Sequence, residues 1–135
     1  MTPILLYAST AVIFLGLDAI MLTTVMRPLF QRHIGGMLLA DIRMVPAALF
    51  YLAYIAGLTY LVGLPGLKTG APVLIPAAII GAMAYGTYEF TNYATLRDWH
   101  PSMVATDLIW GTVLTGFSVW AGVAITRALT GVLSG

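Results

Sequence analysis

Four long runs of apolar residues constrain this chain more than any other feature of its sequence. They cover about residues 4–26, 45–64, 73–94 and 103–129, and a helix needs about 20 such residues to cross a membrane. A soluble domain has about a quarter of its residues charged, whereas only 8% of this chain is charged and 60% is hydrophobic. Because lipid offers the backbone no hydrogen bonds, the runs must form helices. The sequence therefore predicts an all-α fold, an integral membrane four-helix transmembrane bundle forming a single domain over residues 1–135.

The basic residues predict how this bundle is oriented. Four arginines lie in the first and third connections, whereas only Lys68 and Arg127 lie toward the opposite side. Cytoplasmic connections of membrane proteins carry an excess of Lys and Arg. We therefore expect both termini on the non-cytoplasmic side.

The first connection is the longest, and it mixes large apolar residues with charges. Pro28 is expected to follow the end of the first span, and the segment after it is expected to lie in the membrane interface. Gly35 and Gly36 are expected to break this segment. The sequence thus places a short interfacial segment between the first two spans.

Several classes of function are excluded by what the chain lacks. It has no cysteine and a net charge of +1, so it has neither a thiol site nor a basic patch for nucleic acid. No phosphate-binding loop is present. His33 and His100 stand in no metal-binding motif, so we expect no metal site. No cofactor can be assigned from the sequence.

Three carboxylates fall inside the predicted spans, namely Asp18, Glu89 and Asp107. With the orientation above, all three lie in the cytoplasmic half of the membrane. An ionised carboxylate at the centre of a membrane helix costs about 2.5–3.5 kcal/mol, so these side chains must face the interior of the bundle. Asp41 and Asp98 are expected at headgroup level.

The short third connection makes the last two spans antiparallel neighbours. Counting from His100 at about 1.5 Å per residue places Glu89 level with Gly111. The same count places Asp107 level with Asn92 and Tyr93. Small residues on the facing sides of both spans would allow close approach of the two helices.

The sequence therefore predicts a polar cavity near the cytoplasmic side, with Arg97 as a counter-charge. Its expected ligand-binding residues are Asp18, Tyr85, Glu89, Asn92, Asp107 and Trp110. If a reaction takes place, Asp18, Glu89 and Asp107 are the candidate general acids or bases. A structural alternative is a network in which these acids and the arginines neutralise one another. Trp99 is expected with the headgroup-level residues or as a packing aromatic.

Three functions remain open at this stage. The first is the binding, with or without chemical modification, of a lipid or other amphiphile at the cytoplasmic side. The second is a proton- or cation-coupled carrier or channel that acts as an oligomer. The third is an accessory subunit of a larger membrane complex. Membrane lipids are the expected partners in each case, with a homo-oligomer or a larger complex in the second and third.

Several motifs resemble those of a family of small bacterial membrane proteins. The motifs are "TYEFTNYATLRDW", "TDLIWGTVLTG", "LGLDAIML", "MRPLFQRHIG" and "ALFYLAYIAGL". Together they resemble domain-of-unknown-function family 2177 over nearly the whole chain. Its characteristic positions match Asp18, Thr91, Asn92, Thr95, Leu96, Asp107, Trp110 and Gly111, while Glu89 stands where the family more usually has Asp. The resemblance implies a four-span protein of the bacterial inner membrane and implies no particular activity.

Overall fold

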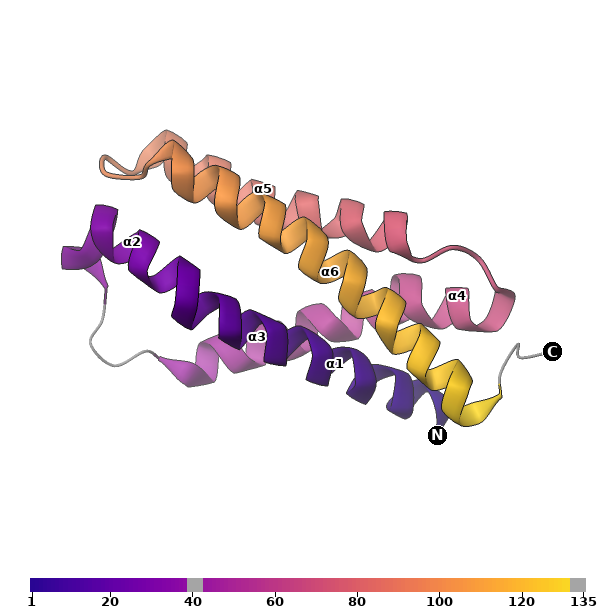
Figure 1. The fold of residues 1–135 in the computed structure, drawn as a ribbon. Helices are drawn as coiled ribbons and strands as arrows, with labels where there is room; N and C mark the ends of the chain where they lie inside the picture. The colour runs from indigo at the N-terminus through magenta and orange to yellow at the C-terminus, as the bar shows by residue number, and fades with distance from the viewer. Residues whose placement is uncertain (39–42, 132–135) are drawn as a thin grey trace.

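The computed structural model describes residues 1–38 and 43–131, and every regular element in these ranges is helical (Figure 1). The elements combine into four long helices joined by short connections. The start of α1 and the end of α6 lie at one end of the molecule, and α2 lies at the other end with the connection between α5 and α6. This arrangement agrees with the antiparallel order predicted from the sequence.

The first long helix continues well past the predicted end at Met26. It consists of α1 (Thr2–Met21), a π-helical segment η1 (Leu22–Met26), α2 (Arg27–Ile34) and a 3-10 turn η2 (Gly35–Met37). The α-helical part ends at Ile34, directly before the two glycines predicted to break the segment after Pro28, and Pro28 itself does not stop the helix.

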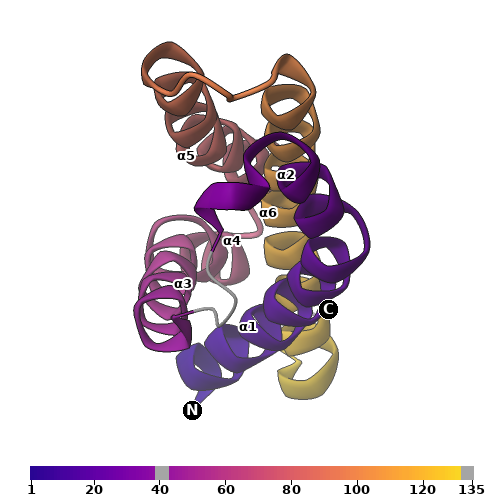
Figure 2. The ribbon, with the colours of Figure 1, turned by 90° about the vertical axis from the view of Figure 1, so that its left-hand side faces the viewer.

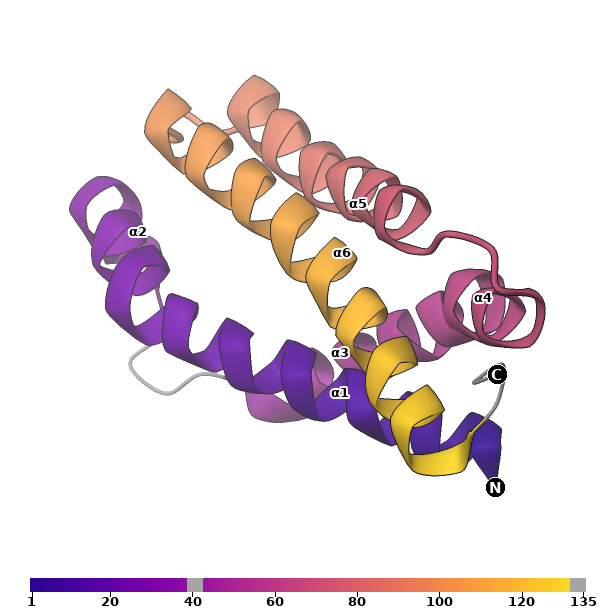
Figure 3. The ribbon, with the colours of Figure 1, turned by 45° about the vertical axis from the view of Figure 1, so that its right-hand side comes forward.

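The π-helical segment explains why Pro28 is tolerated. A proline cannot donate a backbone hydrogen bond, and its ring collides with the carbonyl four residues earlier. Widening the preceding turn relieves this collision. Two threonine hydroxyls in this turn donate to backbone carbonyls, from Thr23 to Ala19 O at 2.9 Å and from Thr24 to Ile20 O at 2.6 Å. Figure 3 shows the first helix bending as α1 passes into α2.

The second long helix also contains a π-helical segment shortly before a proline. It consists of α3 (Met44–Leu58), a π-helical segment η3 (Thr59–Gly63) and α4 (Leu64–Thr69), with Pro65 just after the π-helical segment. The Thr59 hydroxyl donates to Ile55 O at 2.9 Å. The helix ends at Gly70, whose φ of 77° is a left-handed conformation that glycine adopts without strain.

The last two long helices are α5 (Leu74–Thr95) and α6 (Pro101–Thr130), and their bounds lie close to the prediction. Three of the four long helices in the described ranges are both long enough and apolar enough to cross a membrane. These are Thr2–Met37, Met44–Thr69 and Pro101–Thr130. The remaining helix, α5, has sufficient length, but its second half carries Glu89, Asn92 and several tyrosines and threonines.

Helix α6 is the centre of the fold. It packs most extensively on α5 and then on α1, while η3 and α4 also contact it. Figure 3 shows α6 between α5 and α1, and Figure 2 shows the four long helices from the α2 end. A core cluster that includes Leu6, Leu58, Val62 and Val119 fills the space near the start of α1 and the second half of α6.

Small residues bring α5 and α6 together, as predicted. A Cβ atom on Gly81 would lie 2.5 Å from Gly111 O and 2.7 Å from Thr115 Cβ, so no larger residue fits there without movement. The Tyr85 ring lies directly against Gly111.

The register of α5 against α6 differs from the predicted one by about one turn. Gly111 faces Tyr85, not Glu89, and Asp107 is the neighbour of Glu89. These pairs are symmetric about Asp98, the middle residue of the connection between the helices. The count from His100 was wrong because His100 already caps α6, accepting the Ser102 backbone N–H at 3.1 Å.

Large apolar side chains cover the outside of all four long helices. Examples are Val12 on α1, Phe50 on α3, Met83 on α5 and Ile109 on α6, each more than 60% exposed. Water does not solvate such a surface favourably, whereas lipid chains do. The outer surface is therefore that of a membrane protein.

Candidate functional site

Two carboxyl groups meet where α5 packs on α6. Glu89 is completely buried, Asp107 is 8% exposed, and the two are close enough for a hydrogen bond between their side chains. Glu89 Oε2 faces no donor among the described residues. Two ionised carboxylates in contact repel each other strongly in a low-dielectric interior. When one of the two acids holds a proton, its O–H group donates to the other acid.

The other oxygen of Glu89 is bound by a tryptophan from the connecting loop. The Trp99 indole Nε1–H donates to Glu89 Oε1 at 2.9 Å. Trp99 is 6% exposed, and its ring makes edge contacts with Phe30 at 5.2 Å and Tyr88 at 5.9 Å between centroids. The Trp99 side chain therefore points into the protein and not toward the lipid headgroups, because the buried Glu89 carboxyl group accepts its N–H hydrogen bond.

Asp18 of α1 joins the site through a second tryptophan. The Trp110 indole Nε1–H of α6 donates to Asp18 Oδ1 at 3.1 Å. Asp18 also interacts with the hydroxyl of Tyr51 on α3 and lies close enough to Asp107 to interact electrostatically. Side chains from four helices therefore converge, and we call Asp18, Glu89 and Asp107 the carboxyl cluster.

Tyrosines surround the carboxyl cluster. The Tyr85 hydroxyl is buried without a hydrogen-bond partner and interacts electrostatically with Asp18 and Asp107. Asn92 is half-buried and interacts with the Tyr88 hydroxyl. The structure thus brings together all six residues predicted to bind a ligand, with Asn92 at the edge of the group.

Sequence reasoning missed two residues of this site. The sequence predicts Trp99 only as a headgroup-level or packing aromatic, and it assigns no role to Tyr51. The signal for Trp99 is its place in a five-residue connection, which returns the chain onto the end of the helix that carries Glu89. The signal for Tyr51 is its spacing of three residues from Tyr54 on the same helical face.

The cluster is held by neutral donors. Among the described residues, no ion pair joins any of the three acids to an arginine, and Arg97 is exposed. Asp98 is also exposed, and Asp41 lies outside the described residues.

The two histidines lie at the α2 end of the molecule. The rings of His33 and His100 stack on each other, with 4.2 Å between their centroids. Within the described ranges, no three His, Asp or Glu side chains form a metal-binding group.

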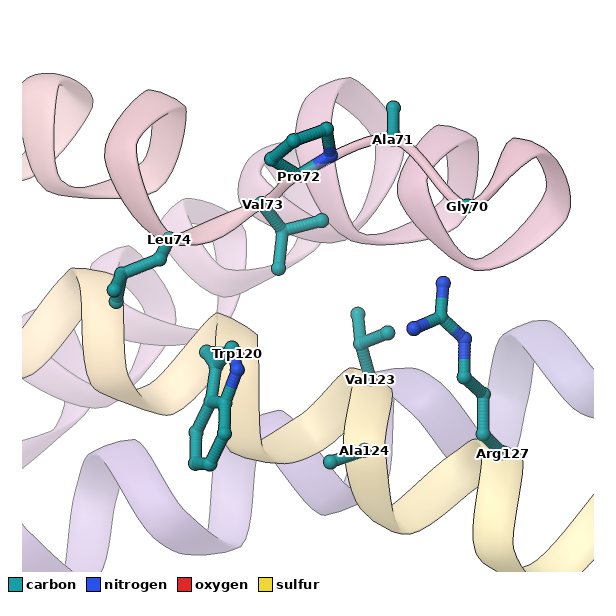
Figure 4. Close-up of a pocket in the computed structure, with 9 residues that line it drawn as sticks. All are labelled: Gly70, Ala71, Pro72, Val73, Leu74, Trp120, Val123, Ala124 and Arg127. Carbon is teal, nitrogen blue, oxygen red and sulfur yellow. The ribbon is translucent and has the colours of Figure 1, made fainter. Parts of the chain in front are cut away.

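Two cavities in the described part of the chain have linings that include none of the three acids. The first, of about 280 Å³, lies between the α4–α5 connection and α6, where Arg127 Nη2 donates to Gly66 O at 2.8 Å (Figure 4). The second, of about 320 Å³, lies at the α2 end. Its lining residues are Leu22, Met26, Arg27, Phe30, Met37, Leu38 and Arg43.

These features define a helical membrane protein whose interior holds acids without basic partners among the described residues. The chain belongs to the family described as "Predicted membrane protein (DUF2177)", whose profile matches residues 3–124. The resemblance noted in the sequence is thereby confirmed. No significant match was found among curated proteins or among solved structures.

Proposed function

We propose that this protein crosses a bacterial inner membrane with all four long helices and conducts protons, as a carrier or channel. In this proposal the carboxyl cluster takes up and releases the proton. The contact between Glu89 and Asp107, buried without a basic partner in the described ranges, is the observation that carries it.

The outer surface of α5 supports a fourth crossing. Ile75, Ile79, Met83 and Phe90 are each more than half exposed, so this helix offers apolar side chains to lipid, while its one charged residue, Glu89, is buried. A helix whose ionisable residue faces the protein interior can reside in a membrane.

The distribution of charge supports the orientation. Arg27, Arg32 and Arg97 lie at the α2 end, whereas Lys68 and Arg127 lie toward the end that holds the start of α1 and the end of α6. By the excess of basic residues, the α2 end is cytoplasmic and both termini are non-cytoplasmic. The carboxyl cluster then lies in the cytoplasmic half.

The chemistry of the pair supports proton exchange. Two carboxyl groups in contact share one proton, because two like charges at that distance repel each other. Carboxyl groups at membrane depth are characteristic of proton relays in pumps and transporters. The two indole donors keep acceptor oxygens of Glu89 and Asp18 in fixed positions while the proton leaves or returns.

The test is a titration of the purified protein in nanodiscs, following the protonated-carboxyl band in the infrared spectrum. We expect Asp107→Asn and Glu89→Gln each to remove a buried carboxyl band that titrates in the wild-type protein. Asp98→Asn is the matched control, because Asp98 is exposed in the loop. If the bands of Glu89 and Asp107 titrate like that of Asp98, the proposal fails.

Transport is tested separately in liposomes that enclose a pH-sensitive dye. An imposed diffusion potential should drive proton entry with the wild-type protein and with Asp98→Asn. Asp107→Asn should abolish this entry while its unfolding midpoint stays within the range of the control. Equal entry with Asp107→Asn would contradict the proposal.

The cavity at the α2 end favours a second function, the binding of an anionic amphiphile. Its lining combines two arginines with five apolar residues, which matches a phosphate headgroup with an acyl chain. Native mass spectrometry should show an anionic phospholipid retained by the wild-type protein and lost with Arg27→Gln. The control Arg97→Gln, at an exposed position outside this cavity, should keep it.

A further inference from the structure

Four hydroxyl groups extend from the carboxyl cluster into the middle of the protein. They belong to Tyr85 on α5, Tyr54 on α3, and Thr115 and Ser118 on α6, and we call them the hydroxyl row. Thr115 and Ser118 are completely buried, and the Tyr85 hydroxyl is buried as well.

The contacts within the row give it an order. The Tyr85 ring lies against Gly111, which is one turn after Asp107 and one turn before Thr115 on α6. Its hydroxyl is close enough to Asp107 and Tyr54 to interact electrostatically. The Tyr54 hydroxyl is hydrogen-bonded to Thr115 Oγ1 at 3.0 Å. Ser118 follows Thr115 by three residues and therefore lies on the same face of α6, about 4.5 Å further along the axis.

Thr115 and Ser118 differ from other hydroxyl residues of α6. Thr112, Thr126 and Thr130 each donate to the backbone carbonyl four residues earlier, at 2.7–2.8 Å. Thr115 instead meets a side chain from another helix, and Ser118 Oγ has no partner among the described residues. A buried hydroxyl without a partner costs about 1–3 kcal/mol, so the orientation of the Ser118 hydroxyl is not explained by the stability of the helix.

The row reaches the apolar core near the other end of the molecule. Val119, the residue after Ser118, belongs to the core cluster with Leu58 and Val62. On the face of α6 that carries Ser118, the next turn brings Gly122, against which the buried Thr10 side chain of α1 packs. From Asp107 to Ser118, α6 rises about 16 Å, which is roughly half of the hydrocarbon thickness of a membrane.

We propose that the hydroxyl row carries protons between the carboxyl cluster and the middle of the protein. This inference rests on the proposed function of the cluster. Each hydroxyl oxygen forms an O–H bond to the incoming proton, and its original O–H bond breaks as that proton moves to the next oxygen. The number of O–H bonds in the row is therefore the same before and after each transfer.

The test compares variants that remove one oxygen with a matched control. Tyr85→Phe and Ser118→Ala each delete a hydroxyl of the row. Thr126→Val deletes an equally buried hydroxyl that is bonded to its own helix at Gly122 O. Proton entry into dye-loaded liposomes and the infrared titration of the carboxyl groups are measured for all of them.

We expect Tyr85→Phe and Ser118→Ala to slow proton entry by about tenfold or more, since one interrupted transfer step that adds about 1.4 kcal/mol to the barrier has that effect. The carboxyl bands should still titrate in these variants. Thr126→Val should conduct at the wild-type rate, and Ser118→Thr, which restores a hydroxyl, should conduct more than Ser118→Ala.

Two outcomes would overturn the inference in distinguishable ways. If the carboxyl groups titrate and the wild-type protein conducts, but Tyr85→Phe and Ser118→Ala conduct like Thr126→Val, the row is not the route and the cluster still stands. If the wild-type protein shows neither a buried titration nor proton entry, the proposed function and the route both fail.

Discussion

Removing the indole donor of Trp99 should destabilise the protein, because Glu89 depends on it. The Trp99 Nε1–H bond at 2.9 Å reaches a completely buried carboxyl group whose other oxygen faces no donor in the described ranges. Trp99→Phe keeps an aromatic ring against Phe30 and Tyr88 but removes the N–H group. A hydrogen bond to a charged group contributes about 1.5–3 kcal/mol, so we expect a loss of about 2 kcal/mol in the free energy of unfolding.

The assay is unfolding in mixed micelles by increasing fractions of sodium dodecyl sulfate, followed by far-ultraviolet circular dichroism. A loss of about 2 kcal/mol changes the folded-to-unfolded ratio by roughly 30-fold, which such a titration resolves. Trp120→Phe is the control, because Trp120 is 50% exposed and should change stability by less than about 0.5 kcal/mol.

A double variant separates the hydrogen bond from the packing of the ring. In Trp99→Phe with Glu89→Met, neither polar partner remains, and replacing both partners by apolar groups is often nearly neutral. We expect the double variant to be less destabilised than the sum of the two single variants. Equal midpoints for Trp99→Phe and Trp120→Phe would refute the reasoning, since the buried carboxyl would then not need its donor.

Three further outcomes are expected from the same unfolding assay. Gly81→Ala should cost about 1–3 kcal/mol, because its Cβ would meet the backbone of α6, whereas Gly16→Ala, with open space around it, should be neutral or stabilising by up to about 1 kcal/mol. Equal effects of the two would show that α5 and α6 are not in close contact. Arg127→Met should cost about 1 kcal/mol through loss of the bond to a carbonyl of α4, and no change in midpoint would exclude that bond. Asp18→Asn should be milder than Asp18→Leu, since an amide oxygen still accepts from Trp110, and the reverse order would contradict the contact.

The apolar runs predicted the long helices well, and the ends of the first two helices poorly. Pro28 and Pro65 normally indicate a stop, yet both helices pass through them by way of a π-helical turn. No propensity rule anticipates this turn, because it depends on a local change in hydrogen-bond register. The threonines before each proline are the only local sign of it.

Helical spacing placed the polar residues on the correct faces, and tertiary contacts decided what they touch. Asp18, Glu89 and Asp107 face inward because lipid excludes them, which a sequence reveals directly. The partner of Glu89 depends on where the connecting loop turns, and a shift of a few residues in that turn changes the register by a full helical turn. The inward orientation of Trp99 could be predicted only after the position of Glu89 was known.

The buried position of Trp99 has a practical consequence for mapping which side of the membrane each end faces. Reporter fusions and epitope tags are usually inserted in short surface connections, which tolerate additions well. An insertion between Leu96 and Pro101 would instead pull the indole away from Glu89 and disturb the interior of the protein. The exposed Ala71 and Pro72 offer a safer insertion point. A tag placed there reports the topology of the intact protein.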